Sequence, residues 1–143
     1  EEGAASIRAG RGVEADNILT RGIEMLRRDP RERVPGEEAL WLYKRGLARL
    51  NLNRPSQAAD DLNRALTLQP TNWIRGRVHV ELGKLADLAG RRADAVAAYR
   101  TARSICEASA DTICENEANQ LLKRPFAFVK SGPSAAPVYQ PIH

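Results

Sequence analysis

The chain has 143 residues, and its 22 basic and 18 acidic residues give a formal net charge of +4 at pH 7. This length suffices for one domain with a buried core, and the sequence has no run of about 18 apolar residues that would span a membrane. Aromatic residues make up only 5% of the chain and are not interleaved with basic ones, which argues against nucleic-acid binding.

Residues 1–34 are predicted to form helical structure followed by a loop. The segment GRGVEADNILTRGIEMLRRDP places Ala15, Leu19 and Gly22 on one helical face. The preceding EEGAASIRAG lacks the charged start and apolar middle of a signal peptide, and we interpret it as the end of a separate, earlier helix. The two prolines in DPRERVPG predict a long loop before the next helix.

The segment 35–71 predicts a pair of amphipathic helices. The first, GEEALWLYKRGLARLNL, has apolar residues at helical spacing and Gly46 in its middle. The second begins at Pro55, because proline is tolerated in a first helical turn, and it ends before Pro70. A single pair of this kind cannot bury its apolar face alone, so the pattern predicts stacking of several units.

The small and apolar residues of this pair recur further along the chain. At an offset of 37 positions, Gly46, Ala58, Leu62 and Ala65 correspond to Gly83, Ala95, Tyr99 and Ala102. Ala58, Leu62 and Ala65 share one helical face, where the short alanine side chains let another helix approach closely. Glycine costs about 1 kcal/mol relative to alanine inside a helix. Its recurrence as Gly83 therefore predicts a contact too tight for a Cβ atom.

This pattern resembles the tetratricopeptide repeat (TPR) family, in which a first helix carries a large apolar residue and then glycine. The second helix of that motif carries alanine, an apolar or aromatic residue, alanine and a closing proline. The matching residues are Gly46, Ala58, Leu62, Ala65 and Pro70, and then Leu82, Gly83, Gly90, Ala95, Tyr99 and Ala102. The family's usual spacing is about 34 residues. The longer offset predicts an extra turn at the start of the helix that contains Trp73, and Glu107 replaces the second closing proline.

The resemblance implies an all-α fold class: a right-handed superhelical stack of antiparallel helix hairpins, a TPR-like solenoid with a C-terminal capping helix. The expected division is a degenerate first repeat and connecting loop (1–34), two TPR repeats (35–71 and 72–108), a capping helix (111–124) and an extended or disordered tail (125–143). Thr112 and Glu115 have the spacing of a capping box at the start of the capping helix. The tail, FAFVKSGPSAAPVYQPIH, is interpreted as a linker, or alternatively as a segment that binds a neighbouring groove.

The two cysteines lie near the connection between the second repeat and the capping helix. Cys106 continues the inward face of its helix, and Cys114 lies in the first turn of the next, so a short connection brings them within reach of a disulfide. A disulfide implies a periplasmic or secreted protein, because such bonds persist in oxidising compartments. The alternative is a pair of buried thiols in a cytoplasmic protein, and redox or metal chemistry is the third interpretation.

No residue pattern predicts catalysis. His79 lies in RVHVEL and is interpreted as a packed or surface helical residue, and His143 is terminal. Zinc-ligand spacing, a nucleophile elbow and a phosphate-binding glycine loop are all missing from the sequence. The acidic pairs at 37–38 and 60–61 are interpreted as surface charge. We therefore expect no enzyme activity, no catalytic residue, no metal and no cofactor.

The TPR resemblance implies a concave groove, formed by the first helix of each repeat, that holds a peptide or helix of a partner protein. By family position, the groove residues are Tyr43, Leu47, Arg77, Val80 and Lys84. Arg77 and Lys84 favour an acidic neighbour. The expected partner is a protein or peptide, with no nucleic acid and no membrane span. The alternative function is a structural or self-associating module of a larger multidomain protein.

Overall fold

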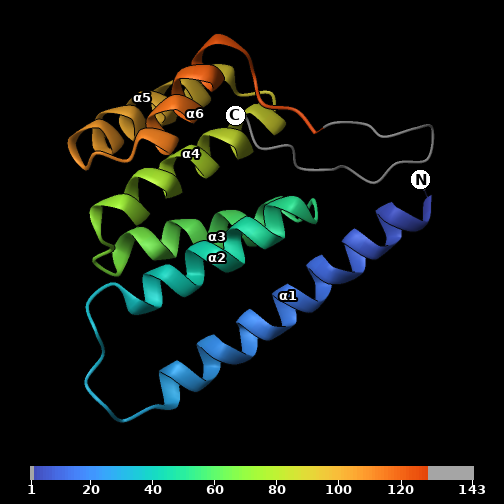
Figure 1. The fold of residues 1–143 in the computed structure, drawn as a ribbon, viewed down its shortest axis with the longest axis vertical. Helices are drawn as coiled ribbons and strands as arrows, with labels where there is room; N and C mark the ends of the chain where they lie inside the picture. The colour runs from blue at the N-terminus through green and yellow to red at the C-terminus, as the bar shows by residue number, and fades with distance from the viewer. Residues whose placement is uncertain (1, 129–143) are drawn as a thin grey trace.

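The computed structural model describes the backbone of residues 2–128 and the side chains of residues 10–128. Within this range the chain is all-helical, as predicted, and the predictions for residues 129–143 lie outside it. The helices are α1 (Glu2–Arg28), α2 (Glu37–Asn51), α3 (Pro55–Thr67), α4 (Asn72–Leu88), α5 (Arg92–Ala108) and α6 (Thr112–Lys123). Each helix packs against the next one along the chain, and α4 also contacts α2 and α6. Figure 1 shows α1 at one end of the molecule and α5 and α6 at the other.

Helix α1 is a single unbroken helix, so the expected break between two helices near Gly10 is wrong. The close contact at Gly12 accounts for a glycine inside this continuous helix. A Cβ atom on Gly12 would lie 2.7 Å from Leu52 Cδ2, so this glycine allows α1 to approach the end of α2. The described part of the segment 1–34 thus contributes one helix, which packs against α2, instead of a helix pair.

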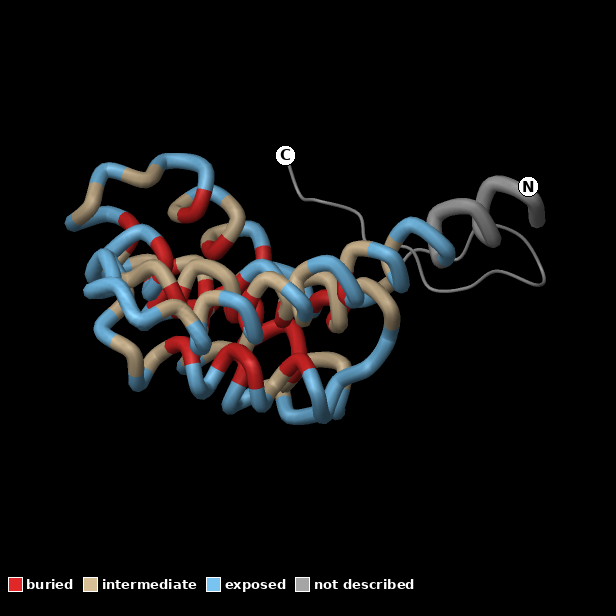
Figure 2. The backbone as a smooth tube through the Cα atoms, turned by 90° about the horizontal axis from the view of Figure 1, so that it is seen from below, coloured by how far each residue is buried: buried red, intermediate tan, exposed pale blue. Residues whose placement is uncertain are grey.

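All six helices contribute buried residues to the core, including the predicted faces of α3 and α5. Ala58, Leu62 and Ala65 are fully buried, and so are Ala95, Tyr99, Ala102 and Cys106. Figure 2 shows the buried stretches gathered where the helices face one another, with exposed stretches on the outside. The prediction that these stripes face inward is confirmed.

The glycines in the middle of α2 and α4 make equivalent close contacts. A Cβ atom on Gly46 would lie 2.8 Å from Leu62 Cγ, and one on Gly83 would collide with the ring of Tyr99. The predicted contact, too tight for a Cβ atom, is therefore confirmed at both positions. Helix α4 has 17 residues against 15 in α2, and the additional residues lie at its start. This lengthening is in the predicted place, although it is shorter than a full turn.

The hairpin turns also recur at the same offset of 37 positions. Asn53 follows α2 with φ +56°, and Gly90 follows α4 with φ +76°. The next residue donates its N–H back into the preceding helix in both turns, from Arg54 to the Arg49 carbonyl and from Arg91 to the Ala86 carbonyl, each at 2.8 Å. Left-handed backbone favours glycine and tolerates asparagine, which accounts for the residue types.

Gly83→Ala is expected to lower the free energy of unfolding by up to about 2 kcal/mol. Overpacking costs about 1–3 kcal/mol, from which the roughly 1 kcal/mol that alanine gains over glycine inside a helix is subtracted. Tyr99 cannot readily yield, because its hydroxyl donates to Asp87 Oδ2 at 2.6 Å. Gly10→Ala is the matched control, because a Cβ atom there meets nothing within 4 Å. The control should gain up to about 1 kcal/mol in urea denaturation. Equal stabilisation by both changes would contradict the close contact.

A charge network connects α1, α2 and α3. Asp61 accepts hydrogen bonds from Arg45 at 2.7 and 2.9 Å and from Arg49 at 3.0 Å. Asp16 of α1 accepts from the same Arg49 at 3.1 Å and from Arg54 at 2.9 Å. Arg49 therefore bridges two carboxylates from different helices, and the pKa of Asp16 is lowered because its hydrogen bonds to Arg49 and the other donors outweigh the effect of burial.

The interpretation of both acidic pairs as surface charge is wrong for one member of each. Asp61 and Glu38 are buried, whereas Asp60 is exposed and Glu37 is half-buried. Glu38 pairs with Arg33 at 2.8 Å, so the loop after α1 is attached to the start of α2. Neighbouring residues on a helix point about 100° apart, and the inward member of each pair meets arginine.

The segment after α6 begins as packed structure. Phe126 is buried, and its N–H donates to Asp87 Oδ2 at 3.0 Å. The Phe126 and Phe128 rings meet edge to face, with centroids 5.5 Å apart. The predicted extended or disordered tail (125–143) thus begins as non-helical chain, which packs against α4 through Phe126.

Candidate functional site

A pocket of about 160 Å³ opens between α2, α4 and α6. We refer to it as the central pocket. Its lining residues are Tyr43 and Leu47 of α2, Arg77, Val80 and Glu81 of α4, and Ile113, Cys114 and Glu117 of α6. The structure thus brings four of the five predicted groove residues together. All the lining residues come from these three helices, so α6 serves as a wall of the site as well as covering α4.

The face of α4 follows from its helical spacing. Trp73, Arg77, Val80 and Lys84 succeed one another at three- and four-residue steps, which places them on one side of the helix. Trp73 is 41% exposed, and the guanidinium carbon of Arg77 lies 5.6 Å from the centre of its ring. Trp73 therefore presents an exposed ring against Arg77 of the pocket lining.

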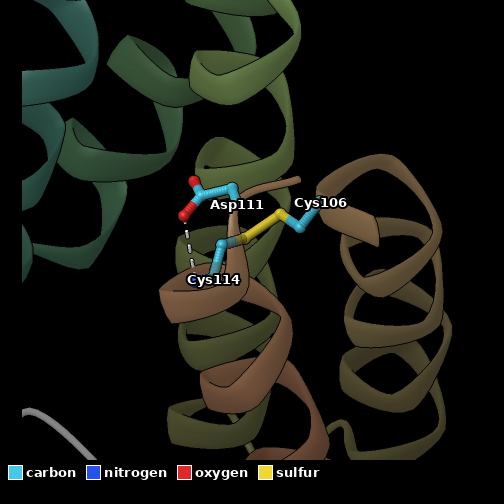
Figure 3. A group of neighbouring side chains, drawn as sticks. All are labelled: Cys106, Asp111 and Cys114. Atoms are coloured by element: carbon cyan, nitrogen blue, oxygen red, sulfur yellow. Dashed lines mark hydrogen bonds between the residues drawn. A yellow bond between two sulfur atoms is a disulfide. The ribbon is translucent and has the colours of Figure 1, made fainter. Parts of the chain in front are cut away.

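Arg77 already has an acidic neighbour within the chain. Its guanidinium donates to both carboxylate oxygens of Asp111, at 2.8 and 3.0 Å. These two hydrogen bonds lower the pKa of Asp111 and raise that of Arg77. Asp111 also accepts from the N–H of Cys114 at 3.3 Å (Figure 3) and so caps α6. The cap is therefore Asp111, one residue before the predicted Thr112, because the carboxylate satisfies both the helix end and Arg77.

Lys84 lies beneath the central pocket instead of on its surface. Its side chain is 1% exposed, and Nζ lies 3.1 Å from Glu81 Oε1 and 2.5 Å from Glu117 Oε1. The ring of Phe126 covers it further, with its centre 5.3 Å from Nζ. The prediction placed Lys84 on the correct face of α4, but the sequence pattern does not reveal that α6 and the following segment bury this end of the face.

Glu81 is one of the lining residues that sequence reasoning missed. It is 4% exposed, and its Oε1 is paired with Lys84. Its Oε2 is buried and has no hydrogen-bond partner in the described part of the chain. Leaving a buried acceptor unsatisfied costs about 1–3 kcal/mol. Burial raises the pKa of Glu81, and Lys84 opposes that rise. The sequence signal that could have identified Glu81 is its position three residues before Lys84, inside an apolar run.

The other predicted groove residues form apolar walls. Val80 is buried, Leu47 is half-buried, and the ring of Tyr43 is largely buried. Burial raises the pKa of the Tyr43 hydroxyl, and Glu81 contributes to the same shift. Tyr43 is therefore neutral at physiological pH. Ile113, which the sequence analysis did not assign to the groove, is 69% exposed at the edge of this pocket.

Cys106 and Cys114 form the predicted disulfide, with their Cα atoms 5.8 Å apart (Figure 3). The bond joins the end of α5 to the first turn of α6. The sulfur atoms and a carboxylate oxygen of Asp111 lie within 4.8 Å of one another, as the ligands of a metal ion would. Both sulfurs are consumed by the disulfide, however, and Asp111 is held by Arg77. The oxidised site therefore offers no thiolate ligand.

No protein-family model, curated protein or solved structure matches this chain. Among residues 2–128, no helix combines the length and apolarity needed to cross a bilayer. A functional assignment therefore depends on the geometry of the central pocket and on the repeated helical contacts.

Proposed function

We propose that this chain is a TPR-like helical repeat and that it acts as a non-enzymatic protein–protein interaction scaffold. Helices α2, α4 and α6 take the place of the first helices of successive repeats, and their shared face holds a peptide or helix of a partner protein. The segments 35–71 and 72–108 are the two complete units of this proposal. Their equivalent glycine contacts at Gly46 and Gly83 and their matching hairpin turns support it.

The observation that carries the function is the central pocket and its exposed apolar edge. Ile113 and Trp73 present large apolar surfaces beside the pocket, and such surfaces are typical of interaction sites. The volume of about 160 Å³ is below the roughly 300–1,000 Å³ of small-molecule sites. A pocket of this size holds one side chain of a larger partner, which favours a peptide over a metabolite.

A second candidate is the self-associating module of a larger protein. Helix α1 packs against α2 and leaves apolar side chains on its outer face. Ile18 and Met25 are seven residues apart, so they share that face, and both are exposed. A contact between copies through α1 would cover them.

The disulfide supports a proposal for localisation as well. Bonds of this kind persist in oxidising compartments, so we place the protein in the periplasm or outside the cell. The Cys106–Cys114 bond is the observation that supports this placement.

The groove assignment is tested by selecting random linear peptides displayed on phage against the purified chain. Selected peptides should shift the backbone amide resonances of α2, α4 and α6, because these helices line the central pocket. Ile113→Ser should weaken binding at least about tenfold, because it removes the apolar side chain from the edge of the pocket without adding a charge. Met25→Ser is the matched control, since Met25 is 72% exposed on α1.

The control also separates the two candidate functions. Peptide binding that survives Ile113→Ser but is lost in Met25→Ser would move the site to α1 and contradict the groove. A dimer in sedimentation experiments that Met25→Ser alone dissociates, without any selected peptide, would support the self-associating module instead.

A further inference from the structure

The central pocket presents an acidic acceptor that no described residue satisfies. Glu81 forms part of the pocket wall, its side chain is buried, and its Oε2 has no hydrogen-bond partner. The same carboxylate uses its other oxygen for Lys84. A ligand that donates a hydrogen bond to Oε2 would complete the set of contacts around Glu81.

The charges around this acceptor are also unbalanced. Lys84 lies between Glu81 and Glu117, so its single positive charge is shared by two carboxylates. Arg77, the other cation of the pocket, is engaged by both oxygens of Asp111. With Glu81 ionised, acids outnumber bases by one among these described side chains. Burial opposes that ionisation, and a bound cation would favour it. The pocket thus favours a positive charge, although Arg77 and Lys84 alone predicted an acidic neighbour.

The shape of the pocket suits a long side chain with a charged end. Tyr43, Leu47, Val80 and Ile113 line the same pocket as Glu81 and supply its apolar surface. Lysine and arginine combine an aliphatic stem with a cationic donor, and they bury the stem against such surfaces. The pocket volume of about 160 Å³ resembles that of a cavity of about 150 Å³ that accommodates benzene. One side chain therefore fills it.

We infer that the central pocket recognises a lysine or arginine side chain of the bound partner segment, with its cationic group at Glu81 Oε2 and its stem against Tyr43 and Leu47. This inference rests on the proposed function and names the chemistry of the partner. The positive charges of Arg77 and Lys84 alone led to the opposite charge preference, which the positions of Glu81, Asp111 and Glu117 reverse.

The first test uses the unmodified protein and the peptides selected against it. Arginine should be enriched among them, and replacing that arginine with citrulline should weaken binding at least about tenfold. Citrulline keeps the length and shape of arginine and removes its charge. Because the protein is unchanged in this comparison, a loss of affinity cannot come from a folding defect.

The variant Glu81→Gln tests whether Glu81 causes the preference for arginine over citrulline. It keeps the size of the side chain and removes its charge, so the tenfold preference for arginine over citrulline should fall to about twofold or less. Glu107→Gln is the control, because Glu107 is exposed on α5 and lies outside the pocket lining. Thermal denaturation establishes whether Glu81→Gln is folded, and the citrulline comparison stands if it is not.

The possible failures are distinguishable. Peptides that bind at α2, α4 and α6 with equal affinity for arginine and citrulline would overturn this inference and leave the scaffold function intact. If no peptide is selected, the proposed function fails. Titration with N-acetylarginine amide and N-acetylcitrulline amide, followed by the Glu81 side-chain carboxyl resonance, then decides the inference by itself. A shift with the arginine compound alone supports it, and equal or absent shifts overturn it.

Discussion

Asp61→Ala is expected to lower the free energy of unfolding by about 3 kcal/mol. Removing one partner of a buried ion pair costs about 3–5 kcal/mol, because the remaining charge is left buried without compensation. The Asp61 side chain is 5% exposed, and its loss leaves Arg45 of α2 without a carboxylate partner and Arg49 with Asp16 alone. Both arginines retain some exposure, at 13% and 16%, which places the effect at the lower end of the range.

Asp60→Ala provides the matched comparison. Asp60 is the neighbouring residue of α3 and is exposed, so its removal should change stability by no more than about 0.5 kcal/mol. Urea denaturation of the two variants, monitored by circular dichroism, measures the difference directly. Similar midpoints for both would show that the network joining α1, α2 and α3 contributes little.

Removal of the disulfide is expected to cost about 2–3 kcal/mol. Cys106 and Cys114 are separated by 8 positions, and closing a short loop of this kind restricts the unfolded chain by about that amount. Reduction should therefore move the urea midpoint of the unmodified protein to a lower concentration, whereas the double variant Cys106→Ala/Cys114→Ala should have the same midpoint with and without reductant.

Mass spectrometry supplies the independent measurement for this prediction. The intact chain should be lighter by two hydrogens before reduction than after it. Equal masses would contradict the disulfide, and with it the proposed periplasmic or secreted location. Equal midpoints despite the expected mass difference would mean that the bond does not stabilise the packing of α6 against α5.

Much of the helical framework was predictable because its signals are local. The inward stripes of α3 and α5 follow from alanine and apolar residues at helical spacing, and each is buried by the adjoining helix of its hairpin. The glycines at 46 and 83 have the same origin, since their equivalent contacts lie within one hairpin. This part of the fold therefore depends on contacts between residues that are close in the sequence, which local patterns can predict.

The charged interior was not predictable in the same way. Asp60 and Asp61 are neighbours of identical type, and only the arginines of α2 decide which one is buried. For Lys84, helical spacing predicts the face of α4, but its depth depends on Glu117 of α6 and Phe126 beyond it. These contacts join distant segments, which no local pattern reports.

The residues of the candidate site were also predicted where the sequence pattern assigns them and missed where tertiary contacts decide. Tyr43, Leu47, Arg77 and Val80 were predicted because the TPR motif assigns positions on α2 and α4. Ile113 and Glu117 were missed because the sequence identified α6 as a cover for the last repeat. A covering helix and a groove-forming helix have the same apolar stripe, so the distinction depends on where α6 lies against α4.

The two ends of the helical assembly differ in how they are attached. Helix α6 is fastened at its start by the disulfide and by Asp111, and at its end Arg92 donates to the carbonyls of Leu121 and Leu122 at 2.8 and 3.0 Å. Among the described helices, α1 packs only against α2, and Asp16 joins it to Arg49 and Arg54 by ion pairs. In linear helical assemblies, terminal elements fray first. Ion pairs oppose fraying at both ends, but only α6 has a covalent bond as well, so we expect local unfolding to start from α1.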